Sequence, residues 1–229
     1  MSSATTSASS VGVTADDQSH GRLRADGALL SLSAASGAVD AFAFICLGKV
    51  FAGVMTGNLI LIGASLGTGG DKVAFRAGTT LLGYAAGATF GAWLTARSRG
   101  RWRTVLTVES VLLAAVAVVW AAGLGEHGWT HFVLLAAVSL AMGIQGSVCV
   151  SPTNYITGTL TTLAGRAGSR SLRAADRWLG ARLLAIMAGA AITALVEWTW
   201  SPGAGLVAVP LALFALVAET TVRRGAAAG

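Results

Sequence analysis

Charged residues are scarce in this chain of 229 residues. Asp, Glu, Lys and Arg together make up 11% of it, whereas about a quarter is usual for soluble globular domains. Hydrophobic residues make up 54%, and the mean hydropathy is +0.69. This composition excludes an ordinary soluble domain, so we expect the chain to lie in a lipid bilayer.

Cysteine and histidine are also rare. Cys46 and Cys149 lie inside apolar runs without CxxC or histidine spacing, so the sequence predicts no disulfide framework and no zinc site. His20, His127 and His131 lie in the N-terminal tail or around a loop, away from any candidate nucleophile. We therefore expect no cofactor, no metal and no enzymatic activity.

The charge that is present is mostly positive. The net charge is +6, and the arginines gather in short segments between apolar runs, which indicates membrane topology and not a nucleic-acid partner. Four arginines lie in 97–103 and four in 166–177, so both loops are predicted to be cytoplasmic. The connections near Glu126 and at 201–203 lack Lys and Arg and are predicted to be external.

Long apolar segments account for most of the chain after residue 27. Six of them approach the roughly 20 residues that a helix needs to cross a bilayer, but the second and the sixth are short. If all eight crossed, the two arginine loops could not both be cytoplasmic. We therefore predict an all-α membrane protein with about six transmembrane helices and two short re-entrant or broken segments. The eight segments are 28–47, 50–66, 73–96, 104–124, 130–150, 154–165, 178–198 and 204–221.

The two ends of the chain are polar. Residues 1–26 are Ser/Thr-rich and lack apolar periodicity, so they are predicted to form a disordered cytoplasmic tail. A cleaved signal peptide is the alternative, but the apolar stretch that follows is too long for one and favours a retained first span. Residues 225–229 are predicted to be a short cytoplasmic end, which places both termini on the same side.

The chain partly matches itself when shifted by about a hundred residues. Met55–Asn58 falls on Ile156–Thr159, and several Gly and Leu positions of the third segment fall on the seventh. Each half, 27–124 and 125–224, then reads span, short Thr-Gly segment, span, span. Three crossings per half invert the second copy relative to the first, an architecture that recurs in transporters.

Asp40 lies well inside the first span. A carboxylate facing lipid there would cost about 2.5 to 3.5 kcal/mol, so it is expected to face protein or water. The functional interpretation is a cation or proton site. The alternative is a structural carboxyl group that is hydrogen-bonded to a neighbouring helix.

The two short segments carry the other candidate pathway residues. Thr56, Gly57 and Asn58 offer a hydroxyl, an open backbone and an amide, which could coordinate an ion or a polar solute. Interhelical hydrogen bonding and close packing are an equally good explanation. The counterparts in the second half are Thr157, Gly158 and Thr159.

A few further polar residues interrupt the apolar segments. Gln145 precedes a proline break after the fifth span and is a candidate pathway residue, or it simply satisfies freed backbone groups. Glu109, Glu197 and Glu219 lie towards segment ends, where a solvated or interfacial role is expected.

Two stretches, 37–67 and 142–165, resemble the YoaK family of bacterial inner-membrane proteins, a domain of unknown function. The most specific matches are Gly37–Ala41, Met55–Asn58, Met142–Gln145 and Thr157–Leu160. The resemblance implies a helical, multi-spanning protein of the bacterial plasma membrane without an established activity.

The function that these features favour is a small-solute or ion transporter or channel with a polar site at the midplane of the membrane. A non-transporting scaffold or partner subunit is the main alternative, and an intramembrane enzyme is less favoured. The expected partners are the lipid bilayer and an unidentified solute or ion. Small-residue faces also permit a homo-oligomer.

Overall fold

The computed structural model describes residues 15–97, 102–125, 128–148, 156–171 and 173–227. All regular structure in these residues is helical, which confirms the predicted all-α class. The elements are α1 (Ala15–Cys46), α2 (Met55–Thr68), α3 (Asp71–Arg97), α4 (Trp102–Ala121), α5 (Gly128–Val148), α6 (Ile156–Gly168), α7 (Asp176–Thr199), the 3-10 helix η1 (Ser201–Leu206) and α8 (Ala208–Ala227).

Five helical segments are long and apolar enough to cross a membrane. They are Asp26–Cys46, Arg103–Ala121, Gly128–Ser147, Asp176–Thr199 and Ser201–Ala218. The predicted third span lies in α3, which has 27 residues but is rich in Gly, Ala and Thr and does not qualify by hydropathy. The structure therefore shows a multi-pass membrane protein with five candidate spans, and a sixth span stays a prediction.

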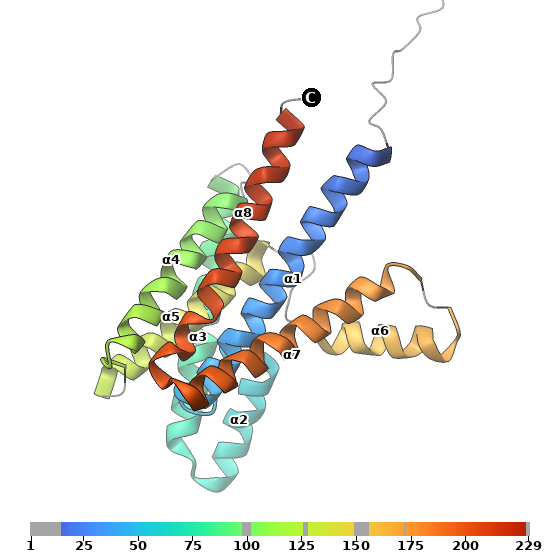
Figure 1. The fold of residues 1–229 in the computed structure, drawn as a ribbon. Helices are drawn as coiled ribbons and strands as arrows, with labels where there is room; N and C mark the ends of the chain where they lie inside the picture. Colours follow the sequence, from blue (N-terminus) through green and yellow to red (C-terminus); the bar gives the residue numbers. More distant parts are fainter. Residues whose placement is uncertain (1–14, 98–101, 126–127, 149–155, 172, 228–229) are drawn as a thin grey trace, which may run out of the picture.

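Helices α2 and α6 are short. They contain 14 and 13 residues, and at 1.5 Å per residue each extends about 20 Å, well below the roughly 30 Å of a hydrocarbon core. Helix α2 packs against α3, and α6 packs against α7. An ion pair between Arg166 and Asp176 joins α6 to α7. Figure 1 shows the α6–α7 pair projecting sideways from the other helices.

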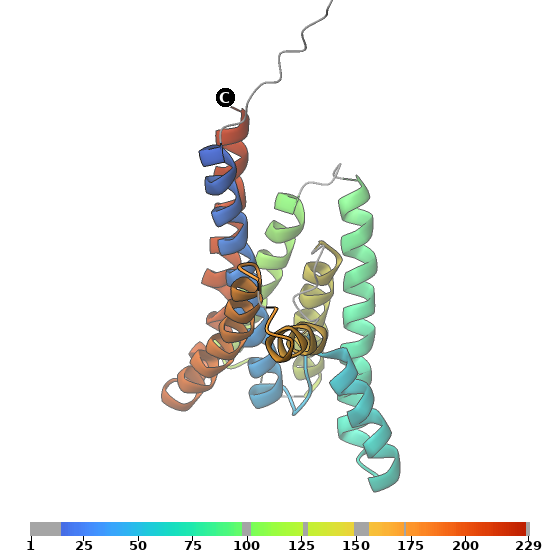
Figure 2. The same cartoon turned by 90° about the vertical axis from the view of Figure 1, so that its right-hand side faces the viewer.

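The helices form two closely packed pairs that are joined through α4, α5 and α8. Helix α3 packs along α5, and α1 packs along α7 and α8, while α4 contacts both α5 and α8 (Figures 1 and 2). The main apolar core lies between these pairs and includes Phe42, Leu47, Leu135 and Met142, with the ring edge of Trp120 against Phe42.

The α1–α7 pair meets through glycine. A Cβ atom built on Gly37 of α1 would overlap the main-chain carbonyl of Ile186, and one built on Gly189 of α7 would overlap the carbonyl of Ala34. Neither position has room for any side chain. Small residues that let two backbones approach in this way are a usual feature of membrane helix pairs.

The α3–α5 pair meets in the same manner. A Cβ atom on Gly87 of α3 would overlap the carbonyl of Leu140, and one on Gly143 of α5 would overlap the carbonyl of Tyr84. We call these two contacts, α1–α7 and α3–α5, the glycine seams. They explain these four glycines of the apolar segments by close helix packing.

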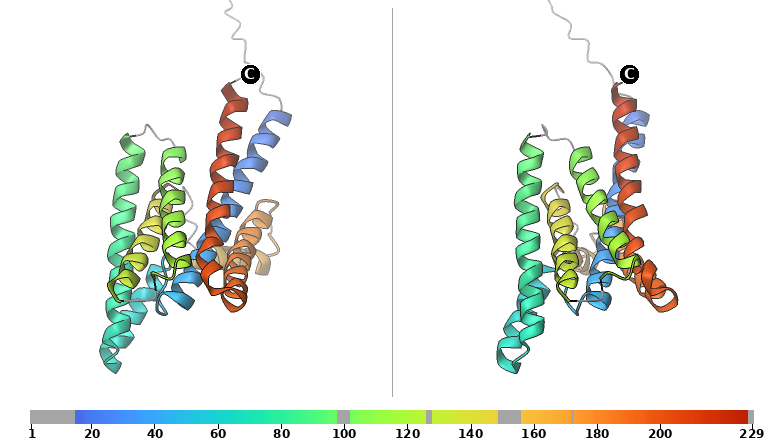
Figure 3. Two further views of the ribbon diagram at one scale, coloured as in Figure 1. Left: turned by 60° about the vertical axis from the view of Figure 1, so that its left-hand side comes forward. Right: turned by 90° about the vertical axis from the view of Figure 1, so that its left-hand side faces the viewer.

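The first turns of α1 and the last turns of α8 lie at the same end of the molecule (Figure 3). Helix α1 begins at Ala15, within the segment that was predicted to be disordered up to residue 26. A helix that is anchored by packing can extend into polar residues, because propagation costs far less than nucleation. Residues 1–14 lie outside the described part of the chain.

Candidate functional site

The non-helical segment between α1 and α2 is held by two side chains. Asp40 of α1 accepts a hydrogen bond from the backbone N–H of Gly53 at 2.7 Å. Asn58 of α2 accepts from the N–H of Phe51 at 2.9 Å and donates to the carbonyl oxygen of Phe51 at 2.6 Å. Its amide also reaches the hydroxyl oxygen of Thr80 on α3 at 2.8 Å. Asn58 thereby joins the segment to α3.

The segment begins with a left-handed turn at the end of α1. Gly48 has a φ of 117° and Lys49 a φ of 65°, and the N–H of Lys49 donates to the carbonyl oxygen of Phe44 at 3.1 Å. The side chain of Arg76 occupies the position that a Cβ atom on Gly48 would need. This turn directs the chain back towards Asp40.

Asp40 and Asn58 are therefore brought together, but the neighbouring candidates differ in their surroundings. Asn58 is fully buried and Asp40 is half-buried, whereas Thr56 is exposed. Gly57 lies against the ring of Phe51, so a Cβ atom there would be 3.1 Å from the ring. Asp40 interacts with the backbone of the segment before α2, and Asn58 interacts with the Phe51 backbone and with Thr80.

The charge of Asp40 and its hydrogen bond can be separated by substitution. We expect Asp40→Ala to lower the free energy of unfolding by about 1.5 to 3 kcal/mol, because a charge-assisted bond to the Gly53 N–H is lost. Asp40→Asn keeps an acceptor oxygen in place and is expected to cost less. Thermal unfolding of the two purified variants checks this. Equal melting temperatures would show that the bond does not stabilise the segment.

The second-half candidates start α6. Gly158 and Thr159 are half-buried in its first turn, and Thr159 has a polar interaction. The side chain of Thr157 lies outside the described side chains. In Figures 1 and 2 the first turns of α2 and α6 lie at a similar height and near each other, beside α1.

Gln145 lies apart from these residues, in the interior of the bundle. It is fully buried and donates to the carbonyl oxygen of Leu32 on α1 at 3.2 Å. Its own carbonyl oxygen has no hydrogen-bond partner among the described residues. The structure therefore ties Gln145 to α1 by a direct hydrogen bond.

The interfacial interpretation of Glu109 is wrong. Its side chain is fully buried on α4, and neither carboxylate oxygen has a hydrogen-bond partner among the described residues. Helix α4 begins at Trp102, so Glu109 lies two turns inside the helix. The signal that could have found it is its position inside a long apolar run. Glu197 is half-buried near the end of α7, and the side chain of Glu219 is not described.

Open cavities lie at the two ends of α4. One, of about 300 Å³, is lined by Ile45, Cys46, Trp120, His131, Glu197 and Ser201. There the carboxylate of Glu197 accepts from the Ser201 hydroxyl at 2.9 Å and from the Cys46 thiol at 3.4 Å. The Cys46 thiol is thus a hydrogen-bond donor to Glu197.

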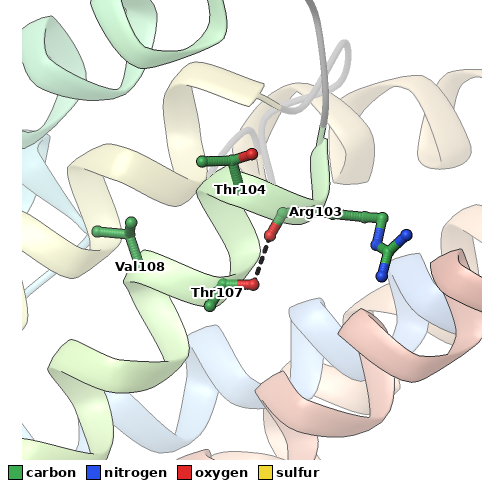
Figure 4. A pocket seen from close by; sticks show the side chains of 4 residues that line it. All are labelled: Arg103, Thr104, Thr107 and Val108. Atoms are coloured by element: carbon green, nitrogen blue, oxygen red, sulfur yellow. Dashed lines mark hydrogen bonds between the residues drawn. The ribbon is translucent and has the colours of Figure 1, made fainter. Parts of the chain in front are cut away.

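The cavity at the other end lies at the first two turns of α4. It has a volume of about 400 Å³ and is lined by Arg103, Thr104, Thr107 and Val108. Figure 4 shows Thr104 and Val108 pointing to one side of α4 and Arg103 to the opposite side. The hydroxyl of Thr107 donates to the carbonyl oxygen of Arg103 at 2.7 Å.

The helices, their apolar spans and the buried polar groups between them define an integral membrane protein. A family model described as "Protein of unknown function (DUF1275)" matches residues 28–219, and the chain belongs to this family. The chain is also similar to the UPF0700 transmembrane protein YoaK of Bacillus subtilis (strain 168), with 30% identity over 144 residues. That match covers 59% of the chain and 63% of the relative, less than two thirds of its length. No solved structure matches. The resemblance to the YoaK family is thus confirmed.

Proposed function

We propose that this protein is a transporter or channel for a small solute or ion in a bacterial plasma membrane. One observation carries the proposal. Helices α2 and α6 are too short to cross a bilayer, and their polar first turns lie near each other beside α1 (Figures 1 and 2). Short helices that start at membrane depth place backbone and hydroxyl groups where they can bind a solute.

We also propose that the halves 27–124 and 125–224 are inverted repeats of three spans each. The glycine seams support this. Gly143 and Leu140 of α5 correspond to Gly37 and Ala34 of α1 when the sequence is shifted by one constant number of residues. Gly189 and Ile186 of α7 follow Gly87 and Tyr84 of α3 by another. Helix α5 in the second half thus corresponds to α1 in the first, and α7 corresponds to α3. The contact between α1 and α7 repeats the contact between α5 and α3 with the two halves exchanged, which is the relation that an inverted repeat requires.

The orientation that we propose places both termini in the cytoplasm. The start of α1, the end of α3, the start of α4 and the end of α8 lie at one end of the molecule (Figures 1 to 3). That end carries Arg97 and Arg103, and positive charge favours the cytoplasmic side. Helix η1, which lacks Lys and Arg, lies at the opposite end.

The scaffold alternative makes a different prediction about water. It treats the Thr-Gly segments and the glycine seams as packing alone, without a solvated path between α2 and α6. We propose no enzymatic reaction for the chain. Lining of a pathway by Asp40, Thr56, Gly57, Asn58, Gln145, Thr157, Gly158 and Thr159 remains part of the transport proposal.

Cysteine accessibility tests the proposal. Thr56→Cys and Thr159→Cys are made separately in a background with Cys46→Ser, which keeps a donor for Glu197, and Cys149→Ala. A small membrane-impermeant thiol reagent is applied to each side of membrane vesicles. We expect both cysteines to react, and a solute that enters the pathway to slow the reaction. Complete protection of both sites in the folded protein would favour the scaffold.

A further inference from the structure

Glu109 is an acidic residue that is completely buried on α4. Its exposed fraction is 0%, and both oxygens of its carboxyl group lack a partner among the described residues. It lies inside the candidate span Arg103–Ala121. A buried carboxylate without a partner is among the most costly groups in a protein, and in a membrane such a group is a functional candidate by default.

The surroundings of Glu109 are apolar. Val105 lies one turn before it and Leu112 one turn after it, on the same face of α4. Both belong to a cluster at the junction of α3, α4 and α5. The cluster consists of Val105 and Ile144, with the partly buried Leu94, Val108, Leu112 and Leu140 packed against them. Glu109 therefore projects from the helix face that packs into this junction.

Other ionisable groups near the junction do not neutralise Glu109. On the elements that pack against α4, the described ionisable side chains are Asp71, Lys72, Arg76, Tyr84 and Arg97 on α3 and His131 on α5, and α4 itself carries Arg103. None of them is a hydrogen-bond or ion-pair partner of Glu109. The described side chains of η1 and α8 include no ionisable group.

One of the two open cavities lies at the end of α4 nearer to Glu109. The open cavity of about 400 Å³ is lined by Thr107 and Val108, and Glu109 follows Val108 directly in the chain. Along α4, Glu109 therefore follows the lining of this cavity by one residue, while its own side chain is buried and not part of that lining. The opposite cavity, at Trp120, is about three turns away.

We propose that Glu109 is a proton-binding residue of this protein. Its carboxyl group holds a proton in the closed junction described here and exchanges it with the cavity at the start of α4 when the junction loosens. A proton suits the site because one carboxyl group binds it alone, whereas a metal cation needs several oxygen ligands. Proton binding by Glu109 does not depend on the proposed function. Only its consequence rests on that function, namely that the proton is coupled to transport through Glu109.

Infrared spectroscopy of the full-length protein in lipid tests the assignment directly. The carbonyl stretch of a protonated carboxyl group is recorded at neutral pH for the wild type, Glu109→Gln, Glu109→Asp and Glu197→Gln. We expect one such band in the wild type, its loss in Glu109→Gln and its persistence in Glu197→Gln. Glutamine has the shape of the neutral acid, so the variant is expected to fold. Glu109→Asp is expected to shift the band, which gives a second measurement if glutamine does not fold.

Three spectroscopic results would overturn the inference. They are a wild type without the band, a band that survives in Glu109→Gln, and a band that disappears when sodium is added at constant pH, which would make Glu109 a sodium ligand. Proton flux into proteoliposomes under a potassium diffusion potential separates the two proposals. We expect at least a tenfold slower flux in Glu109→Gln. An unchanged flux in that variant overturns the coupling of the Glu109 proton to transport and leaves transport standing. If the wild type shows the infrared band of protonated Glu109 but no proton flux, the result supports the inference and counts against transport.

Discussion

Gly87→Ala is expected to lower the free energy of unfolding by about 3 kcal/mol or more, the upper range for overpacking a buried contact. The new methyl group would overlap the main-chain carbonyl of Leu140, and a backbone carbonyl cannot turn away as a flexible side chain can. Helices α3 and α5 would have to separate along their shared length. We expect a large loss of folded protein on purification and a lower melting temperature for what remains.

The same helix supplies a matched control. Gly78 lies on α3 with nothing within 4 Å of its Cβ position, so Gly78→Ala is expected to be neutral or slightly stabilising because alanine favours the helix. Gly189→Ala and Gly180→Ala repeat the comparison on α7. If Gly87→Ala and Gly78→Ala melt at the same temperature, the α3–α5 seam is not the close contact described above.

Asn58→Leu is expected to cost about 3 to 5 kcal/mol, because it leaves a partly buried N–H and carbonyl without their partner and removes one hydrogen bond to a buried hydroxyl. These groups belong to Phe51 and Thr80. Leucine is similar in size, so the cost comes from the lost hydrogen bonds more than from packing. Chemical unfolding of the purified protein measures it, and partial proteolysis near residue 51 reports the release of the segment.

Neighbouring threonines provide the comparison for Asn58. Thr80→Val removes one partner of the amide and is expected to cost about 1 kcal/mol. Thr79 is adjacent on α3 and only half-buried, and its hydroxyl makes an exposed bond to the carbonyl of its own helix at Phe75, so Thr79→Val is expected to change little. Equal stability of Asn58→Leu and Thr79→Val would contradict the role of Asn58 in joining α2 to α3.

The helix positions were largely predictable, because a bilayer sets the length and polarity of each segment. The short second and sixth segments, predicted at 50–66 and 154–165, correspond to α2 and α6. The error at the start of α2 has a physical cause. Residues 50–54 are apolar enough to resemble helix, but their backbone groups are held by Asp40 and Asn58 in another conformation. Hydropathy does not register such bonds.

The pairing of helices and the burial of Glu109 were not predictable in the same way. Glycine indicated close packing, but only the folded chain shows that α1 meets α7 and that α3 meets α5. Glu109 stood five residues inside an apolar segment, which suggested an interface. The apolar run around Glu109 is a signal of burial, but it does not identify the helix that covers the residue. The clustering of Val105 on α4 with Ile144 on α5 is a relation between two helices that no local pattern contains.

The glycine seams also bear on the entropy of the fold. Most helix contacts fix side chains in one rotamer, and each fixed side chain costs roughly 0.5 to 2 kcal/mol in conformational entropy. Where Gly37 meets Ile186 and Gly87 meets Leu140, glycine meets a carbonyl group, and no rotamer is frozen at those points. At these points, two helices can separate and pair again without the ordering of a side chain.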